Sequence, residues 1–125
     1  MKVGSLKLKL QLVCGDAFAL GPGKADLLDA IDREGSISAA GRAMNMSYRR
    51  AWLLVDEMNR CFKERVVETA IGGGSQRGAR LTEAGKAALA DYRELERDAE
   101  ALAERPSLKR LTLAVRGTPI ASETS

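Results

Sequence analysis

The sequence contains no histidine, two cysteines among 125 residues, and few aromatic side chains, which make up 4% of the chain. Without histidine, catalytic triads with an imidazole base and metal sites with imidazole ligands are excluded. No stretch approaches the ~20 consecutive apolar residues of a membrane-spanning helix. The start of the chain alternates Lys and Leu and lacks the apolar segment of a signal peptide. We therefore expect a soluble cytoplasmic protein with no membrane segment, cofactor or metal.

The two cysteines, Cys14 and Cys61, are far apart in the sequence and do not form a Cys-X-X-Cys pair. In a cytosolic protein, two such residues are usually buried free thiols. We favour that interpretation, and a disulfide or a redox function is the alternative.

The composition is that of a folded domain, with 45% hydrophobic and 30% charged residues. A chain of this length accommodates one domain and a tail. Its net charge of +3 is unevenly distributed, because residues 42–80 carry eight basic and four acidic side chains. Residues 81–105 carry four basic and seven acidic ones. This pattern favours one face turned toward a polyanion, although a mixed-charge surface gives the same totals by chance.

The spacing of apolar residues predicts a mainly α-helical chain. Leucine at every second position near the start indicates a half-buried strand, Asn45 suits a tight turn, and Ser47 and Thr82 are favoured helix N-caps. The expected elements are a strand over residues 6–13, helices over 22–34, 36–43 and 47–62, strands over 65–71 and 79–81, a helix over 82–105, and a strand over 111–115.

This order of elements is that of a winged helix-turn-helix, a mainly α fold with a small β-hairpin wing. The helix that begins after Ser47 would enter the major groove, where Arg binds guanine and Ser or Tyr binds phosphate or bases. We expect Trp52 to pack in the core, whereas Tyr48 suits the core or the DNA equally. The residues expected to contact DNA are Ser36, Ser38, Ser47, Tyr48, Arg49, Arg50, Gly73, Gly74, Ser75, Gln76, Arg77 and Arg80.

Several motifs resemble the DNA-binding domain of the ModE family of molybdate-responsive transcriptional regulators. They are Ser36–Ser38, Ser47–Arg49 with Ala51–Trp52, and Asp56–Asn59, and the glycine-rich wing also fits. The segment Leu81–Gly85 fits as well and is common in LysR-type regulators, whose winged domain is similar. The resemblance covers roughly residues 5–105. It implies a homodimeric repressor or activator of molybdate-uptake genes.

Full-length members of that family sense molybdate through additional C-terminal oxyanion-binding domains. Here only residues 107–125 follow Pro106, which are too few for such a domain. The resemblance therefore implies DNA binding and leaves regulation by molybdate doubtful. We expect residues 1–105 to form the DNA-binding domain, including a dimerisation helix over 82–105, and residues 106–125 to form a partly flexible tail.

Apolar residues recur at heptad spacing along the last long helix, which is typical of a helix–helix seam. We expect a homodimer through Tyr92, Leu95, Ala99 and Leu102 that reads a near-palindromic operator in double-stranded DNA. Packing of this seam within one chain is the alternative.

Two other functions fit parts of the sequence. Backbone amides of Gly72–Ser75 could hold a small oxyanion with help from Arg77, although the loop lacks the Gly-Lys-Ser/Thr of a phosphate-binding loop. A dimeric adaptor without operator recognition would use only the seam. No nucleophile–base pair is recognisable, so we do not expect an enzyme.

Overall fold

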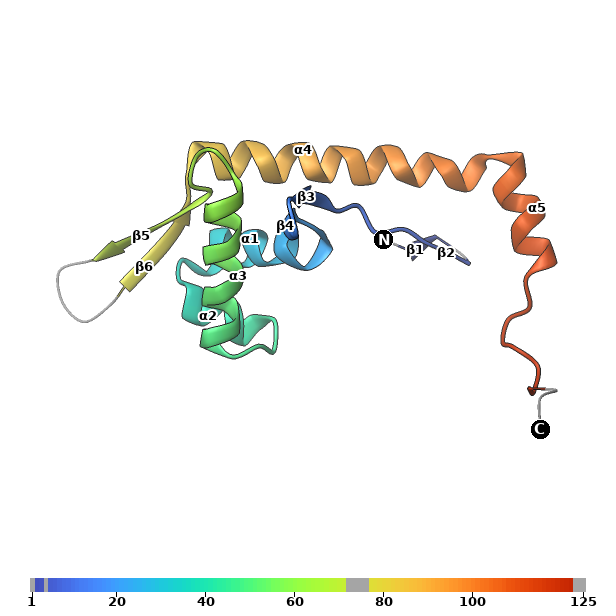
Figure 1. Ribbon diagram of the computed structural model, residues 1–125, viewed down its shortest axis with the longest axis horizontal. Coiled ribbons are helices and arrows are strands. Elements are labelled where there is room, and N and C mark those ends of the chain that lie inside the picture. The colour runs from blue at the N-terminus through green and yellow to red at the C-terminus, as the bar shows by residue number, and fades with distance from the viewer. Residues whose placement is uncertain (1, 4, 72–76, 123–125) are drawn as a thin grey trace.

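The chain folds around one end of a long helix. A computed structural model describes residues 2–3, 5–71 and 77–122. In chain order its elements are β1 (Lys2–Val3), β2 (Leu6–Lys7), β3 (Leu12–Cys14), β4 (Ala17–Leu20), α1 (Pro22–Glu34), α2 (Ile37–Ala43), α3 (Tyr48–Cys61), β5 (Val67–Ile71), β6 (Arg77–Leu81), α4 (Glu83–Glu100), the 3-10 helix η1 (Ala101–Glu104) and α5 (Pro106–Ala114). Helices α1 to α3 and the β5–β6 hairpin gather at one end of α4, and α5 lies at the other end (Figure 1). No helix in the described ranges is long and apolar enough to cross a membrane.

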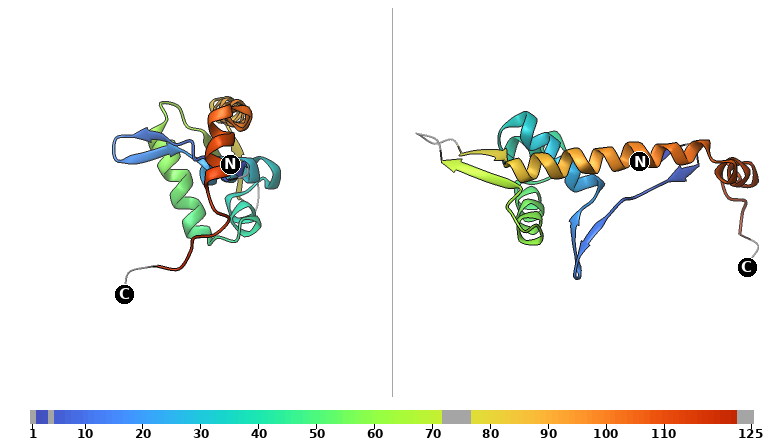
Figure 2. Two further views of the ribbon diagram at one scale, coloured as in Figure 1. Left: turned by 90° about the vertical axis from the view of Figure 1, so that its right-hand side faces the viewer. Right: turned by 90° about the horizontal axis from the view of Figure 1, so that it is seen from above.

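The hydrophobic core lies among α1, α2, α3, the base of the hairpin and the first half of α4. Leu27, Leu28 and Ile31 of α1 are fully buried, as are Ala51 and Met58 of α3. Two further views show that α3 runs across the direction of α4 (Figure 2). These contacts confirm the mainly α-helical winged helix-turn-helix predicted from the sequence.

The helix ends follow the signals that the sequence contains. Pro22 begins α1, and Gly35 ends it with a φ of 77° that favours glycine. Asn45 adopts a φ of 57° in the turn between α2 and α3. The hydroxyl of Thr82 accepts a hydrogen bond of 3.0 Å from the amide of Gly85 at the start of α4. Each of these predicted boundaries is confirmed.

The β5–β6 hairpin, which we call the wing, is held by two neighbouring elements. The Asn59 side chain on α3 accepts hydrogen bonds from the amides of Val66 (2.8 Å) and Val67 (3.2 Å) and donates one to the Val67 carbonyl (3.0 Å). On the other strand, the amide of Ala79 donates to the carbonyl of Gly35 at 2.9 Å. The wing therefore lies beside the start of α2, and the predicted hairpin is confirmed.

The start of the chain differs from its prediction as one strand over residues 6–13. It forms two short antiparallel hairpins instead, β1 with β2 and β3 with β4. Leu6, Leu8 and Leu10 are half-buried while Lys7 and Lys9 are exposed, so the predicted alternation is present through Leu10. It is wrong at Leu12, which is 47% exposed on the β3–β4 hairpin. The strand is interrupted because each short piece pairs only with its neighbour in the chain.

The predicted strand over residues 111–115 is wrong, because most of this segment belongs to helix α5. Pro106 occupies the first turn of α5, where its missing N–H costs no hydrogen bond. The segment faces no described strand with which to form a ladder. Its β-branched residues therefore did not determine its structure.

The two cysteines are both free, and the prediction of two buried thiols is wrong for Cys14. Cys14 is exposed beside the turn between β3 and β4. Cys61 is half-buried as the last residue of α3. The β3–β4 hairpin projects away from the core in Figure 2, which explains why a residue near its turn is exposed.

Candidate DNA-binding surface

Helices α2 and α3 cross closely because residue 41 is glycine. A Cβ atom at Gly41 would lie 3.3 Å from the Cβ of Ala51 and 3.3 Å from the carbonyl oxygen of Met46. The amide of Met46 donates a hydrogen bond of 2.9 Å to the carbonyl of Gly41. These contacts fix the orientation of α3 relative to α2.

The first turn of α3 presents its side chains to solvent. The hydroxyl of Ser47 accepts a hydrogen bond of 3.1 Å from the amide of Arg50, so its proton stays free to donate to another group. Tyr48, Arg49 and Arg50 are all exposed. Within the described residues, no carboxylate forms an ion pair with Arg49 or Arg50. Both guanidinium groups are therefore available to an anionic partner.

The prediction that Trp52 packs in the core is wrong, because 45% of it is exposed. The buried face of α3 is centred on Ala51, Val55 and Met58. Trp52 and Tyr48 lie one helical turn apart on the flank of that face, and 53% of Tyr48 is exposed. Helical spacing places both residues next to the apolar positions of α3 that face the core. The core covers only the centre of this apolar face, so its edge stays exposed.

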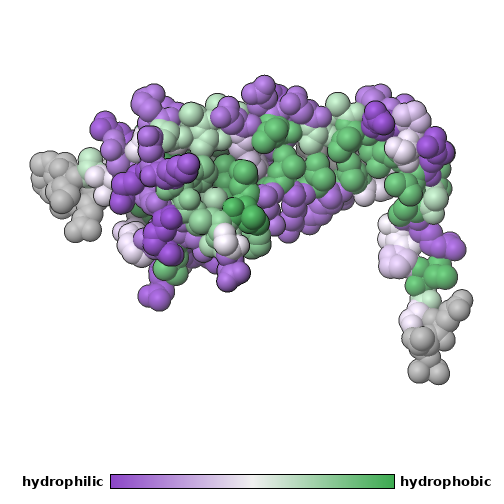
Figure 3. Space-filling model, turned by 45° about the horizontal axis from the view of Figure 1, so that its top comes forward, coloured by the Kyte–Doolittle hydropathy of each residue, from purple (hydrophilic) through white to green (hydrophobic). Residues whose placement is uncertain are grey.

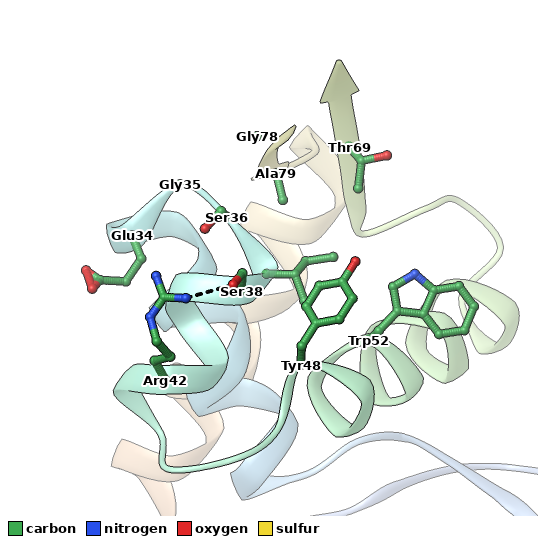
Figure 4. A pocket seen from close by; sticks show the side chains of 11 residues that line it. Glu34, Gly35, Ser36, Ser38, Arg42, Tyr48, Trp52, Thr69, Gly78 and Ala79 are labelled. Atoms are coloured by element: carbon green, nitrogen blue, oxygen red, sulfur yellow. Dashed lines mark hydrogen bonds between the residues drawn. The ribbon is translucent and has the colours of Figure 1, made fainter. Parts of the chain in front are cut away.

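A groove of about 740 Å³ lies between α2, the start of α3 and the wing. Tyr48 and Trp52 line it from α3, opposite side chains from α2 and from the wing (Figure 4). Its walls are formed by Glu34, Gly35, Ser36, Ile37, Ser38, Arg42, Tyr48, Trp52, Thr69, Gly78 and Ala79.

Helix α2 contributes a serine–arginine pair to this groove. The Arg42 guanidinium donates a hydrogen bond of 2.8 Å to the hydroxyl of Ser38, one turn earlier on the same helix (Figure 4). Ser36 caps α2 by accepting a hydrogen bond of 3.0 Å from the amide of Ala39. The sequence prediction included both serines and missed Arg42. Its spacing of four from Ser38 is the signal that could have identified it.

One of the two wing arginines predicted to contact DNA is paired with a carboxylate of the same hairpin. The side chain of Arg80 donates a hydrogen bond of 2.6 Å to the carboxylate of Glu68, which lies directly opposite on β5. Arg77 begins β6 opposite Ile71. Residues 72–76, which include four predicted DNA contacts and the predicted oxyanion nest, lie outside the described residues.

Along α4, the four residues of the predicted dimer seam differ in accessibility. Only 2% of Tyr92 is exposed, and its hydroxyl donates a hydrogen bond of 2.8 Å to the carbonyl of Leu10 in the same chain. Leu95 and Leu102 are exposed, and Ala99 is half-buried. Tyr92 therefore packs within its own chain, so the prediction that it lies in the dimer interface is wrong.

Helix α4 is also tied to α1 by Arg93. Its guanidinium binds Asp26 at 2.8 Å and Asp29 at 2.7 Å, both on α1, and Glu96 at 2.8 Å on α4. Burial lowers the pKa of Arg93, but the hydrogen bonds with these three carboxylates outweigh burial and raise the pKa. This cluster fixes the long helix against the DNA-binding unit.

Comparison with known proteins supports a DNA-binding domain. Residues 24–86 match the family described as "Bacterial regulatory helix-turn-helix protein, lysR family". This range runs from the start of α1 to the start of α4 and contains the groove, α3 and the wing. The family is one of regulators rather than of enzymes.

Individual relatives share this region. The chain is 40% identical over 87 residues to the molybdenum-pterin-binding protein MopA of Rhodobacter capsulatus, which covers 70% of the chain and 33% of the relative. It is 38% identical over 89 residues to the molybdenum transport protein ModE of Azotobacter vinelandii, with 71% and 33% covered. It is 36% identical over 87 residues to the DNA-binding transcriptional dual regulator ModE of Escherichia coli K12, with 70% and 32% covered.

The matched segment spans about a third of the length of these curated relatives. Within it, the helix-turn-helix and its wing account for the similarity. The chain therefore belongs to the lysR family of bacterial regulatory helix-turn-helix proteins, and its helix-turn-helix is a ModE-like DNA-binding domain.

Proposed function

We propose that the chain is a sequence-specific regulator of transcription that binds double-stranded DNA upstream of molybdate-transport or other molybdenum-related genes. The observation that carries the proposal is the exposed first turn of α3, where Arg49 and Arg50 have no ion-pair partner among the described residues. The gene class rests on the names of the relatives, two of which are a molybdenum transport protein and a molybdenum-pterin-binding protein.

Side chains at the start of α3 and in the neighbouring groove supply the chemistry that recognition of the DNA major groove requires. Arg49 and Arg50 can each bind the two acceptors on the edge of a guanine, while the free hydroxyl proton of Ser47 can be donated to a phosphate. The apolar edges of Tyr48 and Trp52 suit the methyl groups of thymine. Arg42 is held by Ser38 and has further N–H groups for the DNA backbone.

The regulator would act as a homodimer through the second half of α4. Apolar side chains gather along this part of the molecule in Figure 3. Leu95 and Leu102 are exposed there, and Leu102 lines a recess of about 400 Å³. This recess is lined by Leu6, Leu102, Arg105, Ser107, Leu108 and Leu111. A second copy would cover these residues and place two recognition helices about 34 Å apart, or a multiple of that, on a near-palindromic operator.

Selection of bound duplexes from a random pool tests the DNA-binding part of the proposal. We expect one enriched near-palindromic sequence, bound with an affinity that falls steeply as salt increases. The selection is then repeated with molybdate. We expect the selected sequence and its affinity to stay the same, and a change in either would show that the chain itself binds the anion. A chain that retains no duplex at any salt concentration would instead fit a dimeric adaptor.

Sedimentation tests the dimer. The double variant Leu95→Glu with Leu102→Glu places charges on the proposed interface and should sediment as a folded monomer. Val13→Glu is the control, because Val13 is also exposed but lies on the β3–β4 hairpin. A double variant that still dimerises would refute the interface, and a wild-type monomer at micromolar concentration would refute the dimer.

A further inference from the structure

The two cysteines meet at one junction, although 47 positions separate them in the sequence. Cys14 is the last residue of β3 and is exposed, whereas Cys61 ends α3 and is half-buried. The Sγ atom of Cys14 lies 3.9 Å from the main-chain oxygen of Cys61, which permits a weak S–H···O hydrogen bond. The thiol of Cys14 therefore lies in contact with Cys61.

The junction is held by an ion pair between a buried lysine and a half-buried glutamate. Lys24 of α1 is 7% exposed, and its Nζ donates hydrogen bonds to the carbonyl of Phe18 on β4 and to the carboxylate of Glu57 on α3. These bonds tie the β3–β4 hairpin to α3 beside the two thiols. Gly15 has a φ of 59° in the turn of the hairpin, which sets the direction of the neighbouring Cys14.

The environment distinguishes the two thiols. Partial burial raises the pKa of Cys61, and the hydrogen bond with the Cys14 side chain raises it further. The charge of Glu57 also raises this pKa, and that of Lys24 lowers it. Cys61 is thus protonated at neutral pH and partly shielded, so a soluble oxidant meets the exposed Cys14 first.

We propose that Cys14 and Cys61 form a reversible intramolecular disulfide, a redox modification site that joins the β3–β4 hairpin to the C-terminal end of α3. The oxidant is a low-molecular-weight disulfide such as oxidised glutathione. Cys14 attacks it, loses its proton and forms a mixed disulfide, which releases one reduced thiol. Cys61 then attacks the Cys14 sulfur, loses its proton and releases the second reduced thiol. Two protein thiols are oxidised and one small disulfide is reduced.

The bridge would leave the DNA-binding surface free. Helix α3 has 14 residues and Cys61 is the last of them, so the bridge lies about 20 Å along the helix from its first turn. A covalent link across so many residues restricts the unfolded chain and raises the melting temperature. The exposed Cys14 sulfur also lets a small reductant reopen the bridge. We therefore expect oxidation to change stability more than operator affinity.

The test exposes the full reduced chain to a glutathione redox buffer and follows free thiols, mass and mobility on a non-reducing gel. We expect loss of both thiols, a monomeric chain lighter by two hydrogen atoms, and one cross-linked peptide that contains Cys14 and Cys61. The melting temperature should rise by several degrees and return after reduction. Two free thiols, glutathione retained on the wild-type chain, or a covalent dimer would each overturn the proposal.

Two single variants serve as matched controls, and neither residue belongs to the DNA-binding surface. Cys61→Ser keeps the exposed thiol and removes its partner, so it should accumulate glutathione on Cys14. Cys14→Ser should keep Cys61 free under the same conditions. In neither variant should the redox buffer raise the melting temperature, and a rise in either would contradict the bridge as its cause.

Discussion

Gly85 lies so close to Val66 that no side chain fits between them. A Cβ atom at Gly85 would lie 2.1 Å from the carbonyl oxygen of Val66 and 2.9 Å from its carbonyl carbon. The start of α4 thereby rests directly on the backbone that leads into the wing. The amide of Thr82 also donates a hydrogen bond of 3.0 Å to the Val66 carbonyl. This contact joins the wing to the long helix.

We expect Gly85→Ala to lower the free energy of unfolding by about 2 kcal/mol or more, because the added methyl overlaps backbone atoms that cannot move aside. Alanine has the higher helix propensity, worth about 1 kcal/mol, but this gain is smaller than the cost of the overlap. Gly23→Ala in α1 is the control, since no atom lies within 4 Å of its Cβ position. Urea denaturation should show Gly23→Ala equal to or above wild type. Equal stability for Gly85→Ala would contradict the close contact.

Arg49 and Arg50 should each contribute base-specific affinity. We expect Arg49→Ala and Arg50→Ala to cost about 1–3 kcal/mol of operator binding and to relax the preference at one base position each. Titration against the selected operator and its single-base variants measures both effects. Arg110→Ala on α5 is the control and should bind as wild type. Unchanged selectivity in both α3 variants would refute the assignment of α3 to the major groove.

Trp52 is the one tryptophan of the chain, and its exposed edge lies in the groove. Its fluorescence should therefore shift when the operator fills the groove, which a core tryptophan would not show. We also expect Trp52→Ala to weaken operator binding about tenfold, a loss of about 1.4 kcal/mol. The variant should remain folded, because nearly half of the side chain is already in solvent. Emission that stays constant on saturation with operator would refute the contact.

Glu68 neutralises Arg80 across the wing, with 2.6 Å between the Arg80 Nε and the Glu68 Oε1. We expect Glu68→Gln to free the arginine for a phosphate, which should strengthen binding to all duplexes and steepen the slope of log affinity against log salt by about 0.9. Arg80→Ala alone should change little. Glu83→Gln at the start of α4 removes the same charge and serves as the control. A steeper slope in the control as well would indicate a general charge effect.

Tyr92 should make stability fall at alkaline pH. Burial raises the pKa of its phenol, and the charge of Glu96 adds to this effect. A raised pKa means that the folded state favours the protonated phenol. The stabilisation is therefore complete below the unfolded value of about 10 and is lost as pH rises through the folded value.

Urea denaturation across this range, in a Tyr48→Phe background that leaves one tyrosine, measures the slope of stability against pH. Adding Tyr92→Phe should flatten that slope. It should also cost about 1 kcal/mol at neutral pH, because the hydrogen bond to Leu10 is lost. An identical alkaline slope in both proteins would show that other groups cause the fall.

The helix-turn-helix was predictable because its signals are local. Ser47 caps α3 by accepting a hydrogen bond from the amide of Arg50, three residues later. Asn45 adopts the left-handed backbone conformation of the turn, which depends on that residue alone. Once the turn has formed, it brings Gly41 of α2 into close contact with Ala51 of α3. The role of Asn59 was not predictable, because its three hydrogen bonds reach the wing only after the chain has folded back on α3.

The failed predictions concern side chains whose surroundings come from distant residues. Trp52 and Tyr92 both lie at apolar helix positions, yet Tyr92 is buried by the N-terminal segment and Trp52 is not covered. Arg80 was predicted to contact DNA, and its pairing with Glu68, which strand register places opposite it, could not be seen in the sequence. Helical periodicity gives the direction of a side chain and does not state what lies in that direction.

Arg93 binds Asp26 and Asp29 about halfway along α4 and leaves the rest of that helix to project from the DNA-binding unit. In the proposed homodimer, the length of this projecting arm would determine the distance between each recognition helix and the two-fold axis. Seven extra residues after Arg93 would lengthen the arm by about 10 Å and keep the same face toward the partner. In that dimer, a helix outside the proposed DNA-binding surface would set the spacing of the operator halves.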